Sequence, residues 1–190
     1  MVAVRQRWPL WSDQYKEREV TDLRVLQGDI ATLDVDVIVN AAAPGLGGGT
    51  GVSRAIHGAA GPDLFAAATA LDPVGRGDAG ITPGFALKAR WVVHAVGPVY
   101  VTGKLGEDKV LARCYRRALE LCVEKQGRSI AFPAISTGAY RFPKDQAARI
   151  AVETVRAFVG ECPDALDQVL FVATGGDNIR ELTAALSAQP

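Results

Sequence analysis

Residues 34–61 place a glycine-rich loop between a buried strand and a helix, and this order constrains the fold of the whole chain. The apolar, β-branched run at residues 37–39 is typical of a strand that is buried on both faces. Five glycines follow between Gly45 and Gly51, and a helical pattern begins near Val52. Glycine lets backbone N–H groups approach a phosphate, and a helix start adds unpaired donors and a positive dipole end. The segment therefore predicts an anion-binding loop, although not a triphosphate P-loop, because no Gly-Lys-Ser/Thr follows.

Strand-like and helix-like patterns alternate along the rest of the chain. Buried strands are predicted at residues 23–27, 36–40, 91–96, 129–135 and 168–173. Helices are predicted at residues 52–71 with a break at Gly61 and Pro62, at 107–124, after Pro143, and up to about Ser187. Residues 72–83 read as a loop and residues 85–89 as a short strand. The alternation predicts an α/β fold in which helices cover both faces of a mostly parallel sheet.

Three polar loops follow predicted strands, at residues 28–30, 40–51 and 136–140. In open parallel sheets, ligands bind beyond the carboxyl ends of the strands. We therefore expect these three loops to converge on one crevice.

Length and composition restrict the classes of protein that fit this pattern. With 190 residues, of which 48% are hydrophobic and 22% charged, the chain is expected to form one domain with a proper core. Lys plus Arg and Asp plus Glu number 21 each, and this zero net charge counts against a nucleic-acid partner. No apolar run approaches the ~20 residues of a membrane span, so no membrane partner is expected.

The cysteines and the N-terminal residues bear on the compartment. Cys114, Cys122 and Cys162 show no CxxC pairing and no nearby His pattern, so we expect no metal site, no disulfide and a reducing compartment. Charges within the first ten residues and the lack of an apolar core segment argue against a secretory signal. The expected location is the cytosol, and no cofactor is expected.

Residues 1–21 are expected to form an N-terminal arm, and residues 22–190 a single domain. Trp8, Trp11 and Tyr15 make the arm more apolar than a disordered tail normally is. Two interpretations stay open. The arm packs on the domain surface, or it contacts a partner.

Six separated motifs carry a family resemblance. They are GDI at 28–30, VDVIVNAA at 35–42, GGGTGV at 47–52, AIHGAAG at 55–61, ITPGFALKARWVVHAVGPVY at 81–100 and FPAISTGAYRFP at 132–143. In this order they resemble the MacroD-type branch of the macrodomain family, over about residues 22–187. The resemblance implies a three-layer α/β/α fold with a mixed, mostly parallel sheet. It also implies a site for ADP-ribose, or for a mono-ADP-ribosyl group carried by a protein.

The resemblance assigns roles to the polar loops. Asp29 would accept a hydrogen bond from the adenine amino group, with the Ile30 backbone beside it, and Asn40 would lie by the distal ribose. The diphosphate would lie between Gly48, Gly49, Thr50, Gly51 and Val52 on one side, and Ser136, Thr137, Gly138, Ala139 and Tyr140 on the other. Tyr140 would also pack near the distal ribose. Plainer alternatives stay open, with Asp29 as a turn or cap residue and Tyr140 as surface packing.

Two departures from the family pattern bear on catalysis. The family usually has Asn where this chain has Ala43, and Asp where it has Ser53; those side chains position the distal ribose and activate water. Alanine has no polar group, and serine is a poor base at neutral pH unless a neighbour activates it. The expected function is ADP-ribose binding with weakened or absent hydrolysis. The alternative is an active O-acetyl-ADP-ribose deacetylase or mono-ADP-ribosyl-protein hydrolase.

No catalytic role is expected for three further residues, Thr174, His57 and His94. Thr174 stands where the family often has an aromatic residue that stacks on adenine, so that contact is missing. His57 lies four residues after Ser53 and the two could share a helix face, but no acidic partner is evident. His57 is therefore expected to be structural, and so is His94, which alternates within a buried strand.

Overall fold

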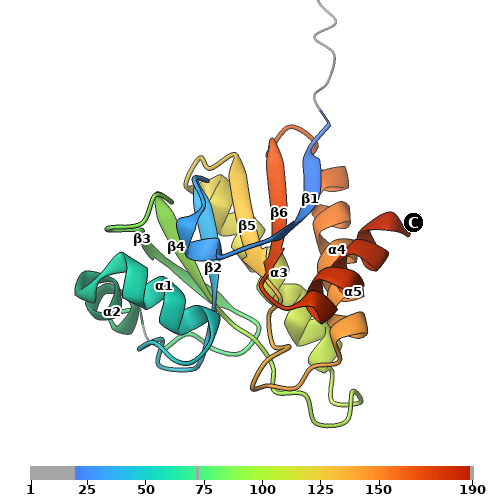
Figure 1. Cartoon of the computed structure of the whole chain (residues 1–190), viewed down its shortest axis with the longest axis horizontal. Helices are drawn as coiled ribbons and strands as arrows, with labels where there is room; N and C mark the ends of the chain where they lie inside the picture. The colour runs from blue at the N-terminus through green and yellow to red at the C-terminus, as the bar shows by residue number, and fades with distance from the viewer. Residues whose placement is uncertain (1–19, 72, 189–190) are drawn as a thin grey trace, which may run out of the picture.

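The computed structural model describes residues 20–71 and 73–188, which form one sheet with helices on both faces (Figure 1). Nearly all of the predicted arm, residues 1–21, lies outside the described residues, so the domain boundary stays a prediction. The strands are β1 Asp22–Gln27, β2 Val37–Ala42, β3 Ala79–Pro83, β4 Trp91–Val96, β5 Ser129–Pro133 and β6 Gln168–Ala173. The helices are η1 Ile30–Thr32, α1 Val52–Ala60, α2 Pro62–Thr69, α3 Glu107–Glu124, α4 Lys144–Glu161 and α5 Gly176–Ser187.

The six strands are arranged in the order β1-β6-β5-β2-β4-β3. Every neighbouring pair from β1 to β4 is parallel, and β3 alone runs antiparallel, beside β4. Parallel neighbours need crossover connections, which here are mostly helical. The mixed, mostly parallel sheet predicted from the sequence is confirmed.

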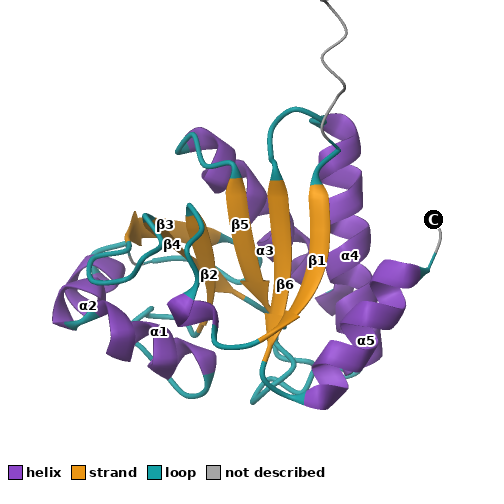
Figure 2. Ribbon diagram, turned by 45° about the horizontal axis from the view of Figure 1, so that its top comes forward, coloured by secondary structure: helices purple, strands orange, loops and turns teal. Residues whose placement is uncertain are grey.

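The two faces of the sheet bury different sets of side chains, because successive residues of a strand point to opposite faces. Val37 and Val39 of β2 pack with the apolar faces of α3, α4 and α5. Ile38 packs on the other side, with Ile56 of α1 and Leu64 of α2. Figure 2 shows α1 and α2 on one side of the strands and α4 and α5 on the other. The three-layer α/β/α architecture is therefore confirmed.

The segment between α2 and β4 differs from the prediction. Residues 79–83, expected to be loop, form the edge strand β3, and Ile81 pairs with Val93 of β4. Residues 85–89, expected to be a short strand, form none, because Phe85 adopts a positive φ of 51° and the segment turns back. The Gly84 N–H donates to the Arg90 carbonyl at 2.8 Å and closes this turn.

The predicted break of the first long helix is confirmed at Gly61, which has a φ of 85° and separates α1 from α2. Glycine adopts this conformation at no steric cost, and Pro62 then opens α2. Across residues 20–71 and 73–188, no helix is both long and apolar enough to cross a lipid bilayer.

Candidate functional site

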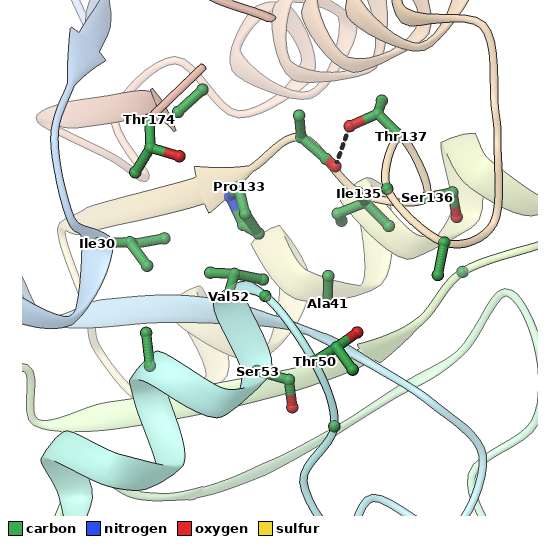
Figure 3. Close-up of a pocket in the computed structure, with 18 of the residues that line it drawn as sticks. Ile30, Ala41, Thr50, Val52, Ser53, Pro133, Ile135, Ser136, Thr137 and Thr174 are labelled. Atoms are coloured by element: carbon green, nitrogen blue, oxygen red, sulfur yellow. Dashed lines mark hydrogen bonds between the residues drawn. The ribbon is translucent and has the colours of Figure 1, made fainter.

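A cavity of about 610 Å³, here called the cleft, opens at the carboxyl ends of the parallel strands (Figure 3). Segments that follow β1, β2, β4, β5 and β6 all contribute to its lining. The three polar loops predicted to converge therefore do meet at one place.

The sheet order determines how the cleft is laid out. In the order of the strands, Asp29 follows β1, Thr174 follows β6, Ser136 follows β5, Ala43 follows β2 and Gly97 follows β4. Beyond the strand ends, the segments after β4 and β5 meet, because the Tyr100 N–H donates to the Tyr140 carbonyl at 2.9 Å. Neighbouring strands lie about 4.8 Å apart, so these five strand ends span roughly 19 Å. The cleft is long enough for an extended dinucleotide-sized ligand, with β1 at one end and β4 at the other.

Asp29 supplies a carboxylate at the β1 end. One of its oxygens, Oδ1, accepts from the Ala31 N–H at 3.0 Å and caps η1. Within the described part of the chain the second oxygen, Oδ2, has no hydrogen-bond partner. Asp29 is thus a cap residue that also keeps one acceptor oxygen available to a ligand, which is compatible with both interpretations of this position.

The glycine loop and the start of α1 form one wall of the cleft. Leu46, almost fully buried with a φ of 50°, anchors the loop to the body of the domain. The backbone N–H groups of Gly49, Thr50 and Gly51 donate to no other described residue. Gly51 is the N-cap of α1 and offers no side-chain cap, so the first-turn N–H groups of the helix also stay open. This wall therefore presents the donors that an anion needs.

Residues 136–140 form the opposite wall and present a matching set of donors. Hydrogen bonds from Phe142 N–H to the Ser136 carbonyl, at 3.0 Å, and from Arg141 N–H to the Gly138 carbonyl, at 2.9 Å, hold the turn. The N–H groups of Gly138, Ala139 and Tyr140 have no acceptor among the described residues. Two donor-rich walls therefore face the middle of the cleft from opposite sides.

Asn40 and Gly48 are the two predicted ligand residues that do not line the cleft. Asn40 is fully buried, and its Nδ2 donates to Nδ1 of His94 at 3.2 Å. His94 Nε2 in turn lies 3.0 Å from Oγ1 of Thr82. The predicted ligand contacts of Asn40 and Gly48 stay predictions. The structure shows Asn40 in a buried chain of hydrogen-bonded side chains. The other predicted ligand residues, Asp29, Ile30, Gly49, Thr50, Gly51, Val52, Ser136, Thr137, Gly138, Ala139 and Tyr140, all line the cleft.

His94 stays neutral at physiological pH because of its surroundings. Burial of its ring, reinforced by the nearby His57, lowers the pKa of His94 to about 4. The two ring centroids are 6.0 Å apart, and burial also lowers the pKa of His57. These histidines form part of the packing between α1 and the sheet, as expected from the sequence.

Ala43 and Ser53, at the two catalytic positions of the resembled family, both line the cleft. Ser53 is buried, and its Oγ has no hydrogen-bond partner in the described structure, His57 included. Figure 3 shows this hydroxyl directed away from the interior of the cleft. No described contact therefore activates Ser53 as a base or nucleophile.

Gly97 is a lining residue that the sequence analysis did not single out. A Cβ added to it would lie 2.3 Å from Oγ of Ser136 and 2.8 Å from Cγ2 of Ile135. Only glycine lets the segment after β4 approach the segment after β5 this closely. The sequence did contain an indication that Gly97 lines the cleft, because this glycine directly follows a buried strand.

Comparisons with known proteins identify the family. The Macro domain family model matches residues 39–151, and the chain belongs to this family. A macro domain-containing protein of Methanosarcina mazei is 45% identical over 173 residues, which are 90% of this chain and 91% of that protein. The O-acetyl-ADP-ribose deacetylase of Klebsiella pneumoniae is 52% identical over 152 residues, which are 78% of this chain and 86% of the enzyme.

A solved structure supports the same assignment. A mutant of the Oceanobacillus iheyensis macrodomain, with ADP-ribose (ADPR), superimposes with a TM-score of 0.82 at 37% identity. The match covers 89% of this chain and 94% of that one. The fold and the family are therefore established together.

The depressed pKa of His94 predicts that acid destabilises the fold. An unfolded His titrates near pH 6.5 and the folded His94 near 4, so between these values only the unfolded chain binds this proton. The free energy of unfolding should fall through this window, with a contribution of roughly 3 kcal/mol at about 1.4 kcal/mol per pH unit. Urea unfolding from pH 7 to pH 4 measures it.

His94→Gln is the matched variant, because every other titrating group stays in place. Its stability difference from the unmodified chain should shrink as the pH falls from 6.5 to 4. Parallel pH profiles of the two proteins would show that His94 does not carry the effect.

Proposed function

We propose that this macrodomain binds ADP-ribose, or a mono-ADP-ribosyl group on a protein, lengthwise in the cleft, with weakened or absent hydrolysis. The observation that carries the proposal is the pair of facing loops, each with three backbone N–H groups that have no acceptor in the described structure. Such donors, with the N-terminus of α1, suit a diphosphate in the middle of the cleft.

The charge distribution along the cleft favours one orientation of the ligand. The Asp29 carboxylate would repel a phosphate, but its free oxygen can accept from the adenine amino group. With adenine at the β1 end and the diphosphate between the loops, the distal ribose reaches Ala43, Gly97 and Tyr140 at the β4 end. The O. iheyensis structure with ADP-ribose supports this class of ligand.

Weakened hydrolysis is proposed because the distal end lacks a base. Among the described residues that line the cleft, Asp29 is the one carboxylate, and there is no His, Cys or Lys. Asp29 lies at the β1 end, four strand positions from β4. General-base assistance is typically worth about 10²- to 10⁴-fold, so its loss slows turnover without affecting binding.

The partner and the location form part of the same proposal. A protein carrying a mono-ADP-ribosyl group would enter with its attachment point at the β4 end. The balanced charge of the sequence and its three free cysteines support a cytosolic site of action.

A second function, deacetylation of O-acetyl-ADP-ribose, is supported by the 52% identity to the K. pneumoniae deacetylase. In that case the diphosphate of the substrate itself would hold the attacking water, with help from backbone groups. The distinction between the two functions is turnover, because both require the same bound nucleotide.

Calorimetric titration with ADP-ribose, AMP and ADP tests the binding proposal through Asp29→Asn. The Asn amide has one acceptor oxygen, whereas the carboxylate of Asp29 has two. In the variant the amide NH2 group must therefore face a second donor, either the Ala31 N–H or the adenine amino group. Since a hydrogen bond to a charged group contributes about 1.5–3 kcal/mol, we expect affinity to fall by about 10- to 150-fold. Asp34→Asn, which removes the same charge from an exposed position, should bind normally. Equal affinities of the two variants would contradict the assigned adenine position.

Turnover of O-acetyl-ADP-ribose separates the two functions. The unmodified chain should be about 10²- to 10⁴-fold slower than a variant that combines Ala43→Asn with Ser53→Asp, because the variant supplies an amide and a carboxylate at the distal end. Product release is measured by chromatography, with thermal unfolding as a check on the fold of the variant. A rate in the unmodified chain equal to or above that of the variant would favour the active deacetylase.

A further inference from the structure

Arg76 lies just outside the lining of the cleft, at its β4 end. It precedes β3, and the start of β3 lies beside the end of β4 because Ala79 pairs with Ala95. Nη1 of Arg76 donates to the Gly97 carbonyl at 3.0 Å, and its guanidinium carbon lies 5.4 Å from the ring centroid of Tyr140. Gly97 and Tyr140 both line the cleft, so this guanidinium forms part of its rim.

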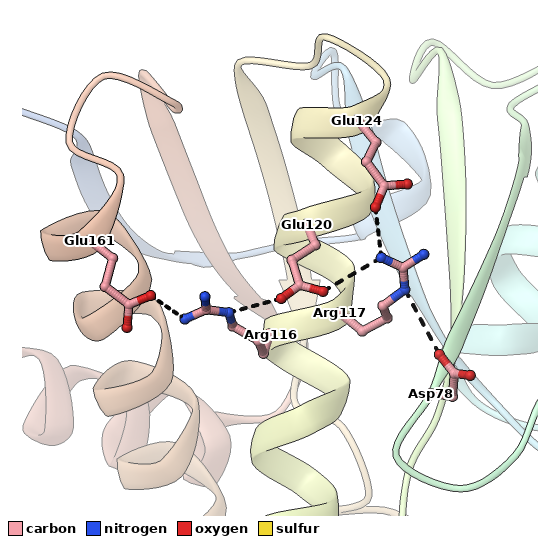
Figure 4. A network of polar contacts seen from close by, with 6 residues as sticks. All are labelled: Asp78, Arg116, Arg117, Glu120, Glu124 and Glu161. Carbon is pink, nitrogen blue, oxygen red and sulfur yellow. Dashed lines mark hydrogen bonds and ion pairs between the residues drawn. The ribbon is translucent and has the colours of Figure 1, made fainter.

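The backbone directly after Arg76 is hydrogen-bonded to Val96, and the Asp78 N–H donates back to the Gly75 carbonyl at 3.1 Å, so the fold sets the position of the cation. The Gly77 N–H donates to the Val96 carbonyl at 2.8 Å, and the Val96 N–H donates to the Asp78 carbonyl at 3.0 Å. The Asp78 side chain lies 3.9 Å from Arg117 of α3, at one end of the ion-pair network drawn in Figure 4. Arg76 is therefore presented by an anchored turn.

Among the described residues, no acidic side chain neutralises the charge of Arg76. Throughout residues 20–71 and 73–188, no carboxylate lies within ion-pair distance of its guanidinium. The Gly97 carbonyl occupies one N–H, and the remaining donors of the fork are not used by described residues. An exposed guanidinium with spare donors is suited to bind a carboxylate in a bidentate manner.

We propose that Arg76 determines specificity by binding an acidic residue that neighbours the ADP-ribosylated side chain of a partner protein. The inference rests on the proposed function, which places the distal ribose, and hence the attached protein, at this end of the cleft. Arg76 would then meet the peptide that flanks the modification and not the nucleotide itself.

The surroundings favour a peptide over a nucleic acid as the flanking chain. Affinity for a nucleic acid comes largely from Lys and Arg side chains that neutralise several phosphates along its backbone. The described lining of the cleft contains no Lys or Arg, and the chain as a whole has zero net charge. A single guanidinium at the rim can pair with one or two carboxylates of a flanking peptide.

The test compares three synthetic ligands that carry ADP-ribose through a stable triazole linkage. The first is a peptide with Glu on both sides of the modified residue, the second has Gln at those positions, and the third is an oligonucleotide. At low salt, the unmodified chain should bind the Glu peptide about three- to tenfold more tightly than the Gln peptide, as a partly exposed ion pair allows. This preference should decline with added salt and disappear in Arg76→Gln.

Two controls make each outcome decisive. Free ADP-ribose should bind equally to the unmodified chain and to Arg76→Gln, and Arg149→Gln, which removes the same charge from α4, should keep the preference for the Glu peptide. A preference that persists in Arg76→Gln would overturn the inference, and so would tighter binding of the oligonucleotide. If free ADP-ribose fails to bind the unmodified chain, the proposed function itself fails, which is a separate result.

Discussion

The parallel pairing of five neighbouring strands is the constraint on which the rest of this structure depends. Parallel strands end at the same edge of a sheet, so the segments after β1, β6, β5, β2 and β4 are brought together there. The same pairing requires crossover connections, and the helices within them cover both faces and bury the continuous apolar runs of β2, β4 and β6. The parallel pairing thus produces both the core and the cleft.

The cleft owes its binding chemistry mainly to backbone groups. Glycines and a turn held by internal hydrogen bonds leave N–H donors open on two facing walls, while Asp29 adds a single acceptor at one end. Asn40, His94 and Thr82 form a buried polar chain that links β2, β4 and β3 within the sheet. Open backbone donors suit a diphosphate, and among the described residues that line the cleft Asp29 is the one carboxylate.

Much of the fold could be predicted from the sequence because its core strands are continuous apolar runs, and α3 and β4 begin and end at the predicted residues. β3 was missed because it is a short edge strand with a glycine and a terminal proline, a composition that also suits a loop. The convergence of the three polar loops was predictable from the rule for parallel sheets.

The remaining features of the site depend on tertiary contacts. The burial of Asn40 behind the cleft wall follows from the direction of one β2 side chain relative to α1, and the sequence does not give that direction. The position of Arg76 over Tyr140 likewise joins residues 64 positions apart. It depends on the pairing of β3 with β4 and on the hydrogen bond from the Tyr100 N–H to the Tyr140 carbonyl. Local patterns carry no information on such contacts.

The most direct test of this account is a crystal structure of the protein with ADP-ribose. The account predicts adenine at Asp29, the diphosphate between the glycine loop and residues 136–140, and the distal ribose beside Ala43, Gly97 and Tyr140. A ligand in the reverse orientation, or one bound away from the carboxyl ends of the strands, would contradict it.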